Sequence, residues 1–250
     1  MQGSGNGDMR GIIPRAIQQI GASKEAMQSQ GWVYDMQVSF VEIYCEKIKD
    51  LLRSFKDDDG AAAAAGTLQH KVMTNDYGQN IVTNARMIPV DPDDNQRIDQ
   101  LMMTAAAARA VRTTDMNAVS SRSHSVFTLH LTARNERMGS MLHGQLNLVD
   151  LAGSERIDRS GVTGTALQEA KNINKSLSSL ADVFDAISKK QKFVPFRNST
   201  LTFLLEMALS GKGKTLMMLN LSPTEASVSE SLSSLRFGAK VRAFTLATRH

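Results

Sequence analysis

Two short segments carry side chains suited to holding a metal-bound phosphate. Residues 117–124 read NAVSSRSH, where serine hydroxyls flank the guanidinium of Arg122. Residues 148–155 read LVDLAGSE, where an apolar run ends at Asp150 and a small-residue turn follows. A hard cation prefers carboxylate and hydroxyl oxygens, and a glycine amide can point at a terminal phosphate. Each segment alone is equally well interpreted as an ordinary loop with serine turns.

Within these segments the residue types suggest separate roles. Asp150 is a candidate to hold a Mg²⁺-bound water, and the amide of Gly153 is a candidate to meet a phosphate. Arg122 would pair with Glu155 if the two loops meet. The hydroxyl groups that could position water or metal belong to Ser120, Ser121 and Ser123.

A third stretch, SGKGKT at 210–215, has the residues of a phosphate-binding loop without its spacing. The pattern G-x-x-x-x-G-K-[ST] requires glycine at position 208, and the chain has Ala208 there. A strand should precede such a loop and a helix should follow it, whereas the apolar run Leu216 to Leu219 follows this one. We interpret it as a basic turn that enters a buried strand over 215–221.

Periodicity predicts the elements that must position these side chains. β-branched and aromatic residues predict a strand over 32–44, and alternation predicts another over 124–135. An apolar run from 144 predicts a strand that ends at Asp150. Short strands are expected at 69–73 and 80–90, and helices at 12–23, 93–112, 170–190, 198–209 (capped by Asn198 or Ser199) and 227–244. This alternation predicts an α/β layer fold with a largely parallel or mixed sheet.

Composition sets the class of protein. The chain has 250 residues of which 42% are hydrophobic, enough for one large α/β domain or two small ones. A net charge of +4 suits an acidic partner but does not choose among nucleic acid, membrane and protein polymer. The single Cys45 excludes an internal disulfide and a Cys-rich zinc site. With no apolar span and no signal peptide, we expect an intracellular, soluble protein.

The two phosphate-type segments together resemble the nucleotide-sensing switches of the kinesin motor domain, whose patterns are N-x-x-S-S-R-S-H and D-L-A-G-S-E. The resemblance extends in family order through GIIPRA, VEIYCEKIKDLL, EAKNINKSL, VPFRNSTLT and SSLRFGAKV. It covers residues 1–250 and is strongest to the C-terminal-motor, minus-end-directed class. It implies a three-layer α/β fold of P-loop-NTPase type, with a central mixed sheet flanked by helices. Residues 56–66, KDDDGAAAAAG, are a low-complexity loop insert.

The resemblance also implies a function, a microtubule-stimulated ATPase that binds ATP or ADP with Mg²⁺. Asn117 and Ser120 to Ser123 would belong to the first switch, and Asp150, Gly153 and Glu155 to the second. The salt bridge between Arg122 and Glu155 would close on the γ-phosphate. Nucleotide contacts would come from Asn117, Ser123, Asp150 and Gly153, with Ser123 and Asp150 also holding Mg²⁺ through water.

The implied partner is the microtubule, with no nucleic acid and no membrane. Basic side chains at the end of a long helix would meet the acidic tubulin surface. The parent protein would be a dimer, joined by a coiled coil outside these residues, and would lie on the cytoplasmic microtubule cytoskeleton, with the spindle as one location open to it. The candidate microtubule contacts are Lys175, Lys189, Lys190, Lys192 and Arg197.

The chain departs from the family in one functional respect. The kinesin phosphate-binding loop lies upstream of the GIIPRA helix, so we expect a truncated domain that lacks this loop and its first strands. Phosphoryl transfer depends on positioning and charge neutralisation, so these residues should not hydrolyse ATP alone. Three hypotheses remain: part of an active motor, a non-catalytic module that binds microtubules or a motor partner, or an inactive truncated product. Cys45 replaces a common asparagine, and Thr200 a common lysine.

Overall fold

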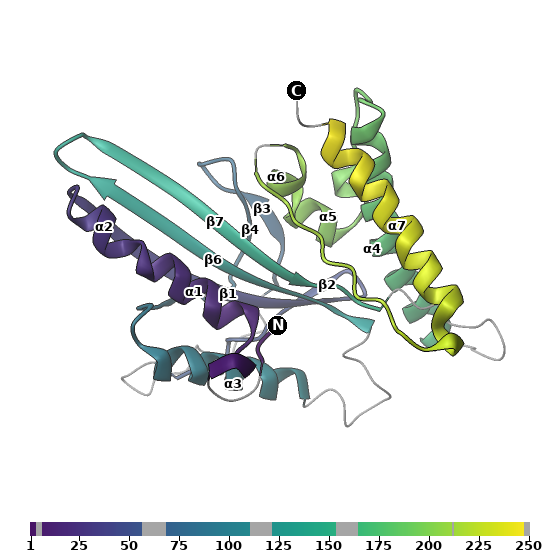
Figure 1. Cartoon of the computed structure of the whole chain (residues 1–250), viewed down its shortest axis with the longest axis horizontal. Helices are drawn as coiled ribbons and strands as arrows, with labels where there is room; N and C mark the ends of the chain where they lie inside the picture. Colours follow the sequence, from purple (N-terminus) through teal and green to yellow (C-terminus); the bar gives the residue numbers. More distant parts are fainter. Residues whose placement is uncertain (4–6, 57–68, 111–121, 154–164, 212, 248–250) are drawn as a thin grey trace. The chain divides into compact units, whose positions relative to one another are not determined.

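The computed structural model describes all residues except 4–6, 57–68, 111–121, 154–164, 212 and 248–250 (Figure 1). The chain divides into two compact units. One comprises Met1–Ile43, Ile48–His70 and Asn84–Leu151; the other comprises Tyr44–Lys47, Lys71–Thr83 and Ala152–His250. Apart from Lys56, the low-complexity insert lies outside the described residues.

The sheet of the first unit has the strand order β2-β1-β6-β7, and β5 also pairs with β1. The strands β1 and β6 have the predicted bounds, whereas β7 begins before the predicted residue 144 because its pairing with β6 continues to Asn135 and Ser140. The short turn at 136–139 makes β6 and β7 one long hairpin (Figure 1). The bounds are β1 Trp32–Tyr44, β2 Lys47–Asp50, β5 Ile88–Pro89, β6 His124–Asn135 and β7 Ser140–Asp150.

The direction of the strands differs from the sequence prediction. The pairs β1–β5, β1–β6, β6–β7 and β3–β4 are all antiparallel, and no parallel pair occurs among the registers that the structure defines. The alternation of strands and helices predicted a largely parallel or mixed sheet. Parallel neighbours need a long crossover, whereas β6 and β7 follow each other through a tight turn.

One face of this sheet forms the core of the first unit. Phe40 of β1 meets Phe127 of β6 edge-to-face, with ring centroids 5.6 Å apart. Helices α1 (Ile12–Ala22) and α3 (Asn95–Ala110) contribute to the same cluster. Their largest fully buried side chains are Ile13, Ile17, Ile98 and Leu101. A short α2 (Lys24–Gln28) and the 3-10 turn η1 (Gly7–Met9) complete the helices near the N-terminus.

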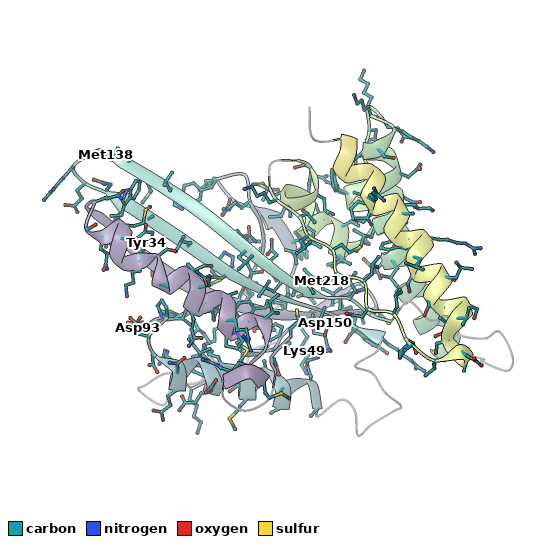
Figure 2. All side chains as sticks on the ribbon, viewed as in Figure 1. Tyr34, Lys49, Asp93, Met138, Asp150 and Met218 are labelled. Carbon is teal, nitrogen blue, oxygen red and sulfur yellow. The ribbon has the colours of Figure 1, made fainter. Side chains whose placement is uncertain are left out.

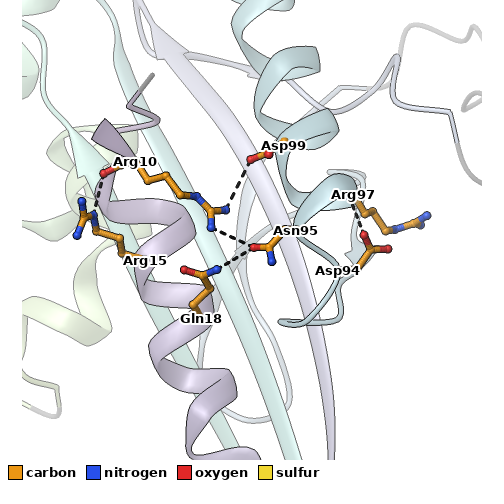
Figure 3. Close-up of polar contacts among 7 residues, drawn as sticks. All are labelled: Arg10, Arg15, Gln18, Asp94, Asn95, Arg97 and Asp99. Atoms are coloured by element: carbon orange, nitrogen blue, oxygen red, sulfur yellow. Dashed lines mark hydrogen bonds and ion pairs between the residues drawn. The ribbon is translucent and has the colours of Figure 1, made fainter. Parts of the chain in front are cut away.

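Polar contacts fasten the start of α1 to the first turn of α3 (Figure 3). The amide oxygen of Asn95 accepts hydrogen bonds from Arg10 at 3.0 Å and from Gln18 at 2.8 Å. The guanidinium of Arg10 also lies 3.6 Å from the carboxylate of Asp99, and Arg15 donates to the Arg10 carbonyl at 2.8 Å. Segments about eighty residues apart in sequence are thereby fixed side by side.

The opposite face of the sheet carries polar side chains along its middle, next to the buried Val41, Ile43 and Val126. Ser39 of β1 and His130 of β6 share a hydrogen bond of 3.2 Å. Thr128 donates to Asn147 across the β6–β7 pair at 2.9 Å, and Thr132 and His143 lie 3.3 Å apart further along the same hairpin. Side-chain hydrogen bonds therefore cross from strand to strand on this face, whereas the aromatic contact of Phe40 with Phe127 lies on the other.

The second unit is mainly helical. Its long helix α4 packs against α7, where Phe184 and Phe237 meet edge-to-face with centroids 6.2 Å apart. None of the helices described in either unit is long and apolar enough to cross a membrane. The elements are α4 Thr165–Ser188, α5 Thr200–Leu204, α6 Glu206–Leu209 and α7 Val228–Ala247, the 3-10 turns η3 Phe196–Asn198 and η4 Glu225–Ser227, and the hairpin β3 Val72–Thr74 with β4 Asn80–Val82.

The helix predicted at 198–209 is interrupted. It appears as α5 and α6, which are separated at Leu205, where the backbone leaves the helical region. Of the two predicted caps, Ser199 has the role, because its hydroxyl oxygen accepts from the backbone N–H of Thr202 at 3.1 Å.

The strand predicted at 215–221 was wrong. Residues 213–223 contain no helix or strand, and Leu216 and Met218 are 86% and 70% exposed. Met218 is labelled in Figure 2. A strand needs a neighbour that supplies hydrogen bonds, and β3 and β4, the strands described in this unit, pair with each other. The apolar composition alone was therefore not sufficient to make a strand.

The two-residue turn between β1 and β2 is conformationally strained. Cys45 and Glu46 have φ angles of 49° and 62°, the left-handed region that a tight hairpin turn requires. Asparagine and glycine adopt this conformation readily, and neither occurs here. Thr200 holds the turn: its N–H donates to the Glu46 carboxylate at 2.6 Å, and its hydroxyl donates to the Glu46 carbonyl at 3.1 Å.

We expect Cys45→Asn to stabilise the chain, because asparagine tolerates the left-handed region better than cysteine does. The gain in free energy of unfolding should be on the order of 0.5 kcal/mol. Urea denaturation followed by circular dichroism measures it. Cys45→Ser is the matched control, since it removes the thiol without adding a left-handed preference. Equal midpoints for the Asn and Ser variants would contradict the strain.

Candidate functional site

The structure describes part of the predicted switch residues. Asn117, Ser120, Ser121 and Glu155 lie outside the described residues, so the proposed pairing of Arg122 with Glu155 is not tested. Arg122 is partly buried and lies two residues before the start of β6. Gly153 lies in an irregular, partly exposed segment shortly after β7. The structure gives side-chain contacts for both Ser123 and Asp150.

Ser123 is enclosed by the first unit. Its side chain is 1% exposed, and its hydroxyl donates to the carboxylate of Glu42 on β1 at 2.7 Å. Glu42 is itself only 2% exposed. The sequence analysis did not single out Glu42, although a carboxylate inside the apolar run SFVEIY was a signal that the side chain needed a buried donor.

Asp150 ends β7 with its side chain half exposed (Figure 2). Its carboxylate lies 3.9 Å from the guanidinium of Arg109, in the last turn of α3. Nearby, the Lys49 ammonium donates to the Ala108 carbonyl at 3.0 Å and caps the same helix end. Arg109 was not among the residues singled out from the sequence, so its contact with Asp150 was missed.

Strand β6 carries the buried His124 and the half-buried His130. Burial lowers the pKa of His124 from 6.5 to about 4, and the charge of Asp150 acts in the opposite direction. Burial also lowers the pKa of His130 to about 4. The unfolded histidines bind protons as the pH falls below about 6.5, while the folded ones remain neutral until about pH 4. Stability therefore falls as the pH is lowered through this window.

The metal role predicted for Ser123 and Asp150 stays a prediction. Among the described residues, no three His, Cys, Asp or Glu side chains gather into a metal-binding group. Mg²⁺ commonly keeps several of its waters and takes one or two carboxylates, and the half-exposed Asp150 is accessible for such a water-mediated contact. The Ser123 hydroxyl is enclosed and donates to Glu42.

The predicted microtubule contacts all lie in the second unit. Lys175 is exposed on α4, and Lys192 is exposed in the connection that follows this helix. Lys190, also exposed, has a φ angle of 50° where the chain leaves α4. Lys189 pairs with Asp185 at 2.8 Å, and the Arg197 guanidinium lies 5.2 Å from the centroid of the Phe203 ring. Positive charge is thus concentrated at the end of α4 and in the connection to η3.

A sequence model of the kinesin motor domain matches residues 1–244. The chain belongs to the kinesin motor domain family. Similar curated proteins include kinesin-like KIN-14M of Arabidopsis thaliana, 45% identical over 98% of this chain and 33% of that protein. Kinesin-like KIN-14N of Oryza sativa is 46% identical over 94% of this chain and 30% of that protein. Kinesin-like KAR3 of Saccharomyces cerevisiae is 40% identical over 96% of this chain and 33% of that protein. The chain thus spans about a third of these relatives, and the expected likeness to C-terminal-motor kinesins is confirmed.

Solved kinesin structures confirm the α/β fold with a central sheet flanked by helices. The motor domain of S. cerevisiae Kar3 aligns with a TM-score of 0.76 at 38% identity, over 93% of this chain and 68% of that one. A structure described as a fast kinesin gives a TM-score of 0.80 at 38% identity, over 96% and 65%. The C-terminal motor and motor homology domain of Kar3Vik1, fused to a synthetic coiled coil, gives 0.79 at 38% identity, over 93% and 57%.

We expect Asp150→Asn to lower the pKa of His124 further, because the substitution removes the negative charge that opposes the effect of burial. NMR titration of the His124 ring proton measures this pKa. Asp35→Asn is the control, since Asp35 is an exposed carboxylate near the opposite end of β1. An unchanged or higher pKa in Asp150→Asn would show that Asp150 does not act on His124.

Proposed function

We propose that this chain contributes the nucleotide switches and the microtubule-facing helix of a motor domain that couples ATP binding and hydrolysis to movement along microtubules. The match of the kinesin motor domain to residues 1–244 carries the proposal. The half-exposed Asp150 at the carboxyl end of β7 supports it, because this is where an α/β sheet reaches its ligands. One solved relative, 38% identical, is described as a kinesin motor ATPase.

The cofactor proposed for the complete site is ATP or ADP with Mg²⁺. Asp150 would hold the cation through water, and the Gly153 amide would meet the terminal phosphate. Arg122 and Glu155 would close over it as a salt bridge. Asn117 and the hydroxyls of Ser120 and Ser121 would complete the first switch. The nucleotide would supply the phosphoryl group whose transfer to water drives the motor.

We further propose that these 250 residues do not turn over ATP by themselves. They contain no G-x-x-x-x-G-K-[ST] sequence, and therefore no lysine placed by such a loop to neutralise the phosphates. A second candidate is a non-catalytic module that binds microtubules or a motor partner. An inactive product is the third. On either of the first two readings the protein would act on the microtubule cytoskeleton, and its parent would dimerise through a coiled coil.

We expect the isolated chain to show no ATP turnover above background, with or without microtubules, because the phosphate-loop sequence is absent. A coupled assay of ADP release measures this. Joining residues 1–250 to the upstream part of the yeast Kar3 motor domain, which would supply the loop, should restore microtubule-stimulated turnover. In that chimaera, Glu155→Ala should abolish the stimulation. Stimulated turnover by the isolated chain, or by the Glu155→Ala chimaera, would contradict these roles.

We expect the chain to pellet with microtubules through its basic residues. Reversing two exposed charges, in Lys175→Glu with Lys192→Glu, should weaken binding roughly tenfold at low salt, because each lost contact with an acidic surface contributes up to about 1 kcal/mol. Co-sedimentation at several salt concentrations measures it. The matched control is Lys24→Glu with Arg137→Glu, which makes the same charge change in the first unit. Equal losses in both pairs would indicate a general charge effect instead of a binding face.

A further inference from the structure

We infer that Ser123 is a positioning residue, which anchors the end of the first switch segment to strand β1 through Glu42 and is not a ligand of the metal. The inference rests on the proposed function, because it assigns a role within the proposed nucleotide site. It follows from the disagreement between the metal role that the sequence suggested for Ser123 and the surroundings that the structure gives this side chain.

Ser123 and Glu42 are both buried. The side chain of Ser123 is 1% exposed, and that of its acceptor Glu42 is 2% exposed. Asp150, the other residue predicted to hold Mg²⁺, is half exposed. A cation that keeps several of its waters at Asp150 occupies a solvated position, and protein atoms close the Ser123 oxygen off from solvent.

The Ser123 hydroxyl and Asp150 lie on different sides of β6. Sheet order places β6 between β1 and β7. Glu42 and Asp150 both lie opposite Ser125 of β6, Glu42 on the β1 side and Asp150 on the β7 side. Neighbouring strands are about 4.8 Å apart, so the two carboxylates belong to strands separated by about 10 Å. The Ser123 hydroxyl, 2.7 Å from Glu42, is therefore directed away from Asp150.

The hydrogen bond from Ser123 also stabilises the buried Glu42 carboxylate. A buried carboxylate is costly unless it accepts hydrogen bonds, and a hydroxyl that donates to a carboxylate makes a bond roughly twice as strong as a neutral pair. Ser123 immediately precedes β6, whose first residue His124 pairs with Ile43. The hydrogen bond to Glu42 therefore extends the attachment of this chain segment to β1 by one residue beyond the backbone ladder.

In this placement Ser123 would stay attached to the sheet and would fix the C-terminal limit of any rearrangement in the first switch. Arg122 precedes this anchored residue, so its backbone position would be restrained when its side chain approaches Glu155. The hydroxyls left to reach a metal are those of Ser120 and Ser121.

Hydrogen exchange of the isolated chain, without nucleotide or microtubules, tests the anchor, so its outcome is separate from that of the motility proposal. Ser123→Ala should speed the exchange of the amides of residues 123–126 by about tenfold, because one charge-assisted hydrogen bond is lost. Ser123→Thr keeps the hydroxyl and should restore protection. Amides 128–133, in the middle of β6, serve as the internal control and should not change.

A double-mutant cycle separates the anchor from general destabilisation. Glu42→Gln keeps the shape of the acceptor and removes its charge, so it should also speed exchange at 123–126. Ser123→Ala combined with Glu42→Gln should then lose less than the two single effects added together. Additive effects, or wild-type exchange in Ser123→Ala, would overturn the inference. If Ser123→Ala does not fold, faster exchange in Glu42→Gln than in Ser123→Thr supports the anchor, and equal exchange overturns it.

Discussion

The pairing of β1 with β6 is the constraint on which the first unit depends. It runs without a break from Trp32 opposite Asn135 to Ile43 opposite His124, and it places Phe40 against Phe127 in the middle of the core. Because side chains alternate across a strand, this register decides which residues face α1 and α3. It also brings Glu42 beside Ser125 at the end of the ladder, where the candidate site begins.

The pairing of β1, β6 and β7 fixes the geometry of the candidate site. Asp150 is the last residue of β7, and the β6–β7 register fixes it opposite Ser125. Helix α3 brings Arg109 to the same place because buried side chains such as Ile98 hold it against the sheet. Charged groups from β7 and α3 thus converge at one end of the sheet, although their positions are set by apolar contacts elsewhere.

The sequence was sufficient where the signal was local and strongly periodic. The bounds of β1 and β6 followed from β-branched residues and alternation, and helix α3 followed from its composition. The prediction failed where structure depended on distant partners. The run at 215–221 had the composition of a strand but lacked a described neighbour, and strand direction could not be derived from the order of elements. Likewise, the contact of Arg109 with Asp150 depends on where a helix ends relative to a strand.

The side-chain hydrogen bonds between strands affect the register in which the strands pair. Apolar alternation repeats every two residues, so a shift of β6 by two along β1 or β7 would leave every core side chain on its proper face. The hydrogen bonds of Ser39 with His130, Thr128 with Asn147 and Thr132 with His143 do not tolerate that shift. These side-chain hydrogen bonds thereby distinguish one alignment from others that hydrophobic burial treats as nearly equivalent.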